Sequence, residues 1–166
     1  MVYLLNREIS FDVDLSTVGC GLNVAFFFVA MDADGGKAKF GYKGPVYGTG
    51  GCDAALAALY KPNCYELDII EANSLSTQLN IHTCKGDNNC EPVGCGFSPY
   101  PLGKKKFYGR GSSYCVDTTK PFTITTRFPT VDGTDTGNLK EIQRIYKQNG
   151  RTIPDPTVTH SLILNC

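Results

Sequence analysis

The chain of 166 residues contains no tryptophan, and it carries no excess of either charge, with 16 Lys and Arg against 16 Asp and Glu. The balanced charge excludes the strongly basic surface on which nucleic-acid binding depends. No apolar run approaches the roughly 18 residues needed to cross a bilayer, since the run at residues 24–30 is too short. Asn-x-Ser/Thr glycosylation sites are also absent. These absences indicate a soluble protein with a neutral surface, which binds neither nucleic acid nor membrane.

Cysteine, in contrast, is abundant. The eight cysteines make up about 5% of the chain, more than an ordinary cytosolic protein carries and fewer than a small disulfide scaffold contains. The even count predicts disulfides and therefore a secreted, extracellular protein. The first residues nevertheless lack the charged start, the long apolar segment and the small-residue cleavage site of a signal peptide. We therefore expect Met1 to be an artificial start, or the chain to be part of a longer protein.

Short strands and frequent turns dominate the pattern. Residues 8–15 alternate apolar and polar, which predicts a half-buried strand, whereas the unbroken apolar run at 24–31 predicts a strand buried on both faces. Residues 54–60 predict a short helix and residues 82–105 a long loop. Further strands are expected at 65–72, 122–128 and 139–148, the last before a hairpin turn at Asn149-Gly150. The pattern indicates an all-β antiparallel sandwich, with residues 1–166 as a single domain.

Three acids lie close together in the expected strand at 65–72: Glu66, Asp68 and Glu71. Because side chains alternate along a strand, Glu66 and Asp68 share a face, and Glu71 would point to the other one. One extra residue in a β-bulge between Asp68 and Glu71 restores the parity and brings all three acids to the same face. The apolar residues between them then anchor the opposite face in the core.

Such a cluster fits a retaining glycosidase. One carboxylate attacks the anomeric carbon, and a second donates a proton to the leaving oxygen and then activates water. A third can hydrogen-bond to the nucleophile and help to separate the pKa values of the set. The spacing alone also allows a solvated acidic strand face or a set of calcium ligands, although like charges on one strand repel each other.

Characteristic motifs follow one another along the chain: EISFDVDLSTVGCGLN, FVAMDADGG, YGTGGCDA, ELDIIEANS, HTC, CGFSPY, FYGRGSSYCVDTTKPFTITTRF and YKQNG. The series resembles glycoside hydrolase family 7, which contains fungal cellobiohydrolases and endoglucanases acting on β-1,4-glucan. CGFSPY, TITTRF and the short loop after His82 are most similar to the endoglucanase branch. The resemblance implies a concanavalin-A-like antiparallel β-sandwich, a jelly roll. It covers essentially all 166 residues but only a central portion of the family's catalytic domain, so a truncated and incomplete sandwich is one expectation.

The resemblance implies a role for each acid: Glu66 is the nucleophile, Asp68 its hydrogen-bonded partner and Glu71 the general acid/base. Three further residues are expected to bind substrate: Asn23, Asp53 and His82. Without the resemblance, His82 would be interpreted as an ordinary loop histidine, and Asn23 and Asp53 as turn residues.

The resemblance also implies three disulfides: Cys52–Cys64, Cys84–Cys90 and Cys95–Cys166. Two cysteines remain, Cys20 and Cys115, which either pair with each other or stay as free thiols. A zinc site is the alternative use of four residues: His82, Cys84, Cys90 and Cys95. Their spacings lack the short Cys-x2–4-Cys knuckle of structural zinc sites, so no metal is expected.

Some positions depart from the family. Gly51 stands where an aromatic residue usually follows YGTG, Phe27 replaces a tyrosine, and Ala55 replaces a sugar-contacting glutamine. These changes and the lack of tryptophan weaken the expected sugar platform.

The sequence therefore predicts a retaining endo-β-1,4-glucanase that acts on cellulose-like glucan, is secreted, works as a monomer and needs no cofactor. The alternatives are a non-catalytic, lectin-like glycan-binding module and an inactive fragment of a cellulase.

Overall fold

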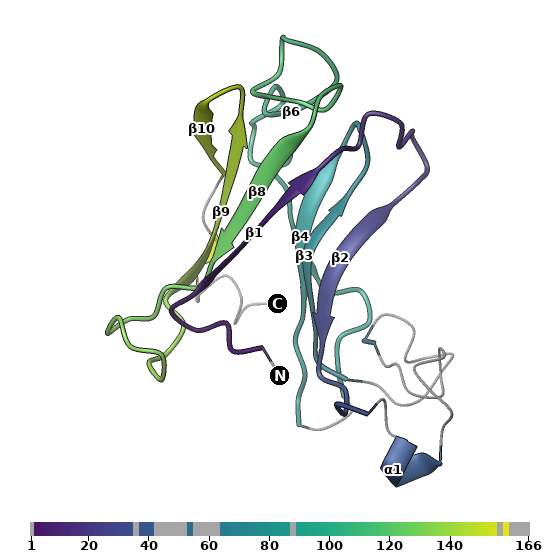
Figure 1. Ribbon diagram of the computed structural model, residues 1–166, viewed down its shortest axis with the longest axis vertical. Coiled ribbons are helices and arrows are strands. Elements are labelled where there is room, and N and C mark those ends of the chain that lie inside the picture. Colours follow the sequence, from purple (N-terminus) through teal and green to yellow (C-terminus); the bar gives the residue numbers. More distant parts are fainter. Residues whose placement is uncertain are drawn as a thin grey trace.

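Two antiparallel sheets face each other in the computed structural model, which describes residues 2–34, 37–41, 53–54, 64–86, 89–155 and 158–159 (Figure 1). The larger sheet has the order β1-β8-β9-β10, and β11 also pairs with β9. Its strands are β1 (Glu8–Val13), β8 (Phe122–Arg127), β9 (Glu141–Gln148), β10 (Arg151–Pro154) and β11 (Val158–Thr159).

The second sheet has the order β2-β3-β4-β5 and carries the three acids. Its strands are β2 (Val24–Val29), β3 (Glu66–Ala72), β4 (Thr77–His82) and β5 (Cys95–Phe97). Three small elements complete the described fold: the parallel pair β6 (Tyr108–Gly109) and β7 (Val116–Asp117), and the four-residue helix α1 (Lys37–Phe40). No helix among the described residues has the length and apolar character to cross a bilayer.

The core lies between the sheets and has two clusters of buried apolar side chains. In the first, Ile70 and Ala72 of β3 pack with Ile124 of β8 and Tyr146 of β9. The second joins Ile69 of β3 and Leu79 of β4 to Phe128 and Ile142. Because each cluster draws residues from both sheets, the arrangement is the expected antiparallel β-sandwich.

Burial along β1 alternates as predicted. Ile9, Phe11 and Val13 are half-buried, and the residues between them are exposed. The β9 segment is a strand, as expected, and its hairpin turns through Asn149 and Gly150, whose φ angles are 52° and 73°. Positive φ at both positions is the geometry that an Asn-Gly hairpin turn requires.

The prediction that residues 24–31 are buried on both faces is wrong. β2 is the end strand of its sheet and pairs with β3 alone within the described part of the chain. Val24, Phe26 and Phe27 are therefore 44%, 40% and 45% exposed. Phe26 still contacts Phe11 of the opposite sheet, with ring centroids 4.9 Å apart.

The expected long loop at 82–105 is also only partly correct, because β5 lies within it. The strand β4 was not anticipated, and neither was α1. The helix predicted at 54–60 lies, apart from Ala54, outside the described residues.

Candidate active site

A β-bulge in β3 brings the three acids together. Asp68 pairs with Asn80 of β4 and Glu71 pairs with Gln78, so two β3 residues, Ile69 and Ile70, lie opposite Leu79 alone. Both isoleucines are buried in the core. The predicted bulge is confirmed, and it returns Glu71 to the face that carries Glu66 and Asp68.

That face lines a groove of about 380 Å³. The groove is bounded by all three acids, by Asp53, and by side chains from β2 and β4: Ala25, Phe27, Gln78, Asn80 and His82. The acids differ in burial: Glu66 and Asp68 are 8% and 4% exposed, whereas Glu71 is only partly buried.

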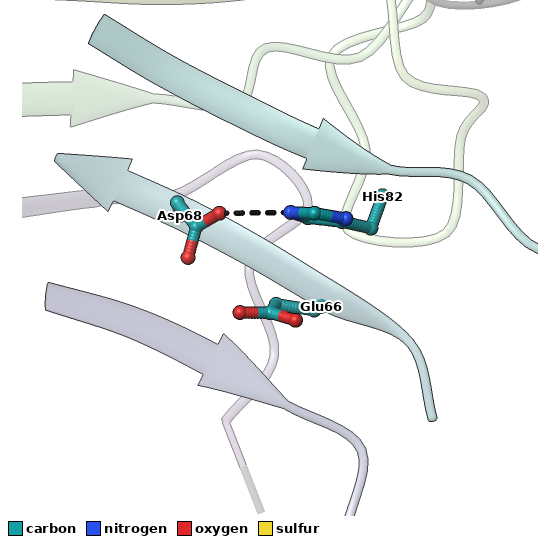
Figure 2. Close-up of side chains that lie close together, drawn as sticks. All are labelled: Glu66, Asp68 and His82. Carbon is teal, nitrogen blue, oxygen red and sulfur yellow. Dashed lines mark hydrogen bonds and ion pairs between the residues drawn. The ribbon is translucent and has the colours of Figure 1, made fainter. Parts of the chain in front are cut away.

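Glu66, Asp68 and His82 form the buried end of the site, with one carboxylate or ring atom of each within 4.8 Å of the others (Figure 2). His82 Nε2 lies 3.2 Å from Asp68 Oδ2, and His82 Nδ1 lies 2.7 Å from the backbone oxygen of Glu91. The backbone N–H of Ala54 donates to Glu66 Oε2 at 2.7 Å. The predicted nucleophile therefore accepts a hydrogen bond from the backbone, and the predicted partner acid accepts one from the histidine.

The surroundings raise the pKa of His82 to about 9. The hydrogen bond to Asp68 is the main cause, and burial opposes it; the Glu91 carbonyl and the charges of Glu66 and Asp68 also favour the charged ring. At neutral pH the ring is doubly protonated, and both its N–H groups donate. The three donor atoms lie close enough together to surround a metal ion, and a ring that keeps both protons would offer it no lone pair.

Glu71 has a different environment. Asn23 Nδ2 donates to its Oε1 at 3.0 Å, and Gln78 Nε2 donates to its Oε2 at 2.8 Å. Of the residues predicted to bind sugar, Asn23 therefore contacts the predicted acid/base directly, and Asp53 and His82 both line the groove.

The sequence interpretation missed two polar residues on β4, Gln78 and Asn80. Gln78 contacts Glu71, and Asn80 Nδ2 lies 3.2 Å from His82 Nε2. A signal was present, because residues 78–82 alternate polar and apolar and so follow the period of a half-buried strand.

Most of the described cysteines are in disulfides. Cys84 and Cys90 form a disulfide, and Cys64 and Cys95 are also disulfide-bonded, while their expected partners Cys52 and Cys166 lie outside the described residues. The alternative zinc site is wrong, since its three cysteines are all in disulfides. The remaining two cysteines do not pair, and both are exposed free thiols: Cys20 and Cys115.

Comparison with known proteins agrees with the geometry. The family model "Glycosyl hydrolase family 7" matches residues 1–61 and 57–165. The chain is 42% identical over 183 residues to the probable endo-beta-1,4-glucanase celB of Aspergillus flavus, an alignment that covers 96% of this chain and 44% of that protein.

Two solved structures extend the comparison. A family 7 cellobiohydrolase from Daphnia pulex superimposes with a TM-score of 0.83 at 35% identity, covering 98% of this chain and 50% of its own. An endoglucanase I complexed with cellobiose gives a TM-score of 0.80 at 34% identity, covering 95% of this chain and 46% of its own.

The chain thus spans about half the length of the relatives that it matches. Within that half, the match to the family model and the identity to the Aspergillus protein extend over nearly every residue. By its acids, its sandwich and these relatives, the chain belongs to glycosyl hydrolase family 7.

Proposed function

We propose that the protein hydrolyses internal β-1,4-glucosidic bonds of a cellulose-like glucan with retention of the anomeric configuration. The observation that carries the proposal is the bulge in β3, which gives Glu66, Asp68 and Glu71 one common face in a groove. Membership of the family and the name of the Aspergillus relative support the reaction and the substrate class.

Glu66 is the nucleophile in this proposal. Glu66 is 8% exposed, and its Oε2 accepts the Ala54 N–H, which orients the carboxylate that attacks the anomeric carbon. Asp68 lies next to it with the protonated His82, whose positive charge offsets part of the repulsion between the carboxylates.

Glu71 is the general acid/base. It is the least buried of the three acids, so it can reach both a leaving oxygen and the water that replaces it. One amide donates to each of its two oxygens, so the carboxyl keeps the same orientation in both half-reactions.

In this proposal Asp53 and His82 contact sugar from the lining of the groove, and Asn23 does so beside Glu71. The exposed ring of Phe27 offers an apolar surface to a pyranose face. The reaction requires no metal or cofactor. We further propose a secreted monomer, in keeping with the Cys84–Cys90 disulfide.

The decisive test is Glu66→Gln, assayed on a soluble cellulose derivative. Loss of the nucleophile should lower kcat by about a thousandfold or more, and NMR of the early products of the unsubstituted protein should show a retained β-anomer. Glu141→Gln on β9, in the opposite sheet, is the matched control and should keep full activity.

A glycan-binding module is the competing function. Binding of β-glucan without hydrolysis, unchanged by Glu71→Gln, would establish it and overturn the catalytic proposal.

A further inference from the structure

Glu71 and Gln78 are cross-strand partners immediately after the bulge. The amide of Gln78 donates to Glu71 Oε2 at 2.8 Å, and the amide of Asn23 donates to Oε1 at 3.0 Å. Gln78 is half-buried on a strand, whereas Asn23 is exposed in the segment before β2. We propose that Gln78 is a positioning residue that orients the Glu71 carboxyl. This inference rests on the proposed role of Glu71 as general acid/base.

Gly96 on β5 provides the space that holds the Gln78 amide in place. A Cβ at position 96 would lie 2.7 Å from Gln78 Oε1, too close for an undisturbed contact. Gly96 is not among the positive-φ glycines, so its backbone would accept another residue. The glycine is therefore required at this position by the amide of Gln78 and not by the conformation of the chain.

Several charged groups share the groove with Glu71. Glu66 and Asp68 face the groove from the same strand, the protonated His82 faces it from β4, and Asp53 lines it. The described residues of β2 and β5 contribute no titratable group to the groove, because β2 is apolar and Cys95 is disulfide-bonded. Gln78 is thus a neutral donor within a mainly acidic set.

A neutral amide that donates to a carboxylate stabilises the ionised form over the protonated form. In a retaining mechanism the acid/base must be protonated for the first step, so its deprotonation sets the alkaline limb of the kcat/KM profile. Gln78→Ala removes a donor from the carboxylate and should move that limb to higher pH. Gln78→Glu places a second carboxyl against Glu71 and should move the limb further in the same direction.

The leaving group gives a readout that a purely structural role would not change. When the C1–O bond of dinitrophenyl β-cellobioside breaks, dinitrophenolate leaves as a stable anion without proton donation, whereas the sugar hydroxyl that leaves from a soluble cello-oligosaccharide must be protonated. On the plateau of the pH profile, Gln78→Ala should lower kcat/KM on the oligosaccharide by about tenfold and leave it within about twofold on the dinitrophenyl substrate. Gln143→Ala on β9 of the other sheet is the matched control and should change neither substrate.

Gly96→Ala tests the same contact from the other side. The added methyl displaces the flexible end of Gln78, so the variant should fold and reproduce the shift of Gln78→Ala. In the double variant Gln78→Ala/Gly96→Ala the limb should move no further than in Gln78→Ala alone, because both changes act through one contact.

Two results would contradict the proposal in distinguishable ways. An active protein whose alkaline limb and leaving-group dependence are unchanged by Gln78→Ala overturns the role of Gln78 and leaves the proposed hydrolysis intact. A protein that hydrolyses neither substrate overturns the proposed function and the role of Gln78 with it.

Discussion

At the scale of single residues, His82 links the protonation of the groove to the stability of the fold. Its pKa is raised from 6.5 to about 9 in the folded protein, mainly by the hydrogen bond to Asp68. A raised folded-state pKa contributes stability that is fully present below pH 6.5 and is lost as the pH rises through 9. His82 should therefore stabilise the fold more at pH 6 than at pH 9.

Each unit of pKa shift corresponds to about 1.4 kcal/mol, so we expect this one residue to contribute at most about 3 kcal/mol. The measurement is urea unfolding between pH 6 and 10 for the unsubstituted protein and for His82→Gln. The difference between the two should shrink as the pH approaches 9, and a difference that is constant with pH would contradict the prediction.

Gly94 is a second residue whose identity the site determines. Its φ is +71°, and a Cβ there would lie 2.6 Å from Asn80 Oδ1 and 2.9 Å from His82 Cε1. Gly86 has the same φ of +71° but has no atom within 4 Å of the added Cβ, so it isolates the cost of the backbone conformation. Gly86→Ala should cost about 1 kcal/mol, and Gly94→Ala about 1–3 kcal/mol more, because overpacking adds to the strain. Chemical denaturation of both variants measures the difference, and equal costs would contradict it.

At the scale of elements, β3 shows what the sequence could predict. The parity of Glu66, Asp68 and Glu71 required a bulge, and the register of β3 on β4 confirms it. The prediction succeeded because it depended only on alternation along one strand, a property that the local sequence contains. The partners of Glu71 could not be predicted in the same way, because Gln78 and Asn23 come from two other segments.

The strand β2 shows the opposite case. Its apolar run resembles a strand covered on both faces, yet Phe27 lines the groove and Val24 is 44% exposed. Burial of a strand depends on which segments lie against it, and composition does not reveal those segments. The spacing along the strand singled out the acids, and the resemblance to the family pointed to His82. Gly94 and Gly96 become meaningful only when β5 is seen against β4.

At the scale of the whole molecule, the exposed edge of β2 affects self-association. Val24–Val29 is uncharged and free of proline, and within the described chain only β3 pairs with it. Edge strands of this composition pair with other chains unless charge or cover prevents it. We expect the proposed monomer to aggregate as the protein concentration rises and Val24→Lys to reduce that aggregation, measured by light scattering.

Val131→Lys is the matched control, since Val131 is a 71% exposed valine outside the strands. Equal effects of the two substitutions would assign the change to net charge and not to the edge of β2.

The bulge also has a consequence for motion. Ile69 and Ile70 are neighbours in sequence but belong to different core clusters. Two adjacent side chains of β3 therefore pack into the interior of the sandwich. An interruption of the ladder would ordinarily be a place where a sheet opens and its amides exchange with solvent. Here the interruption lies over the most firmly packed part of β3, so the segment that carries the acids should be among the last to open.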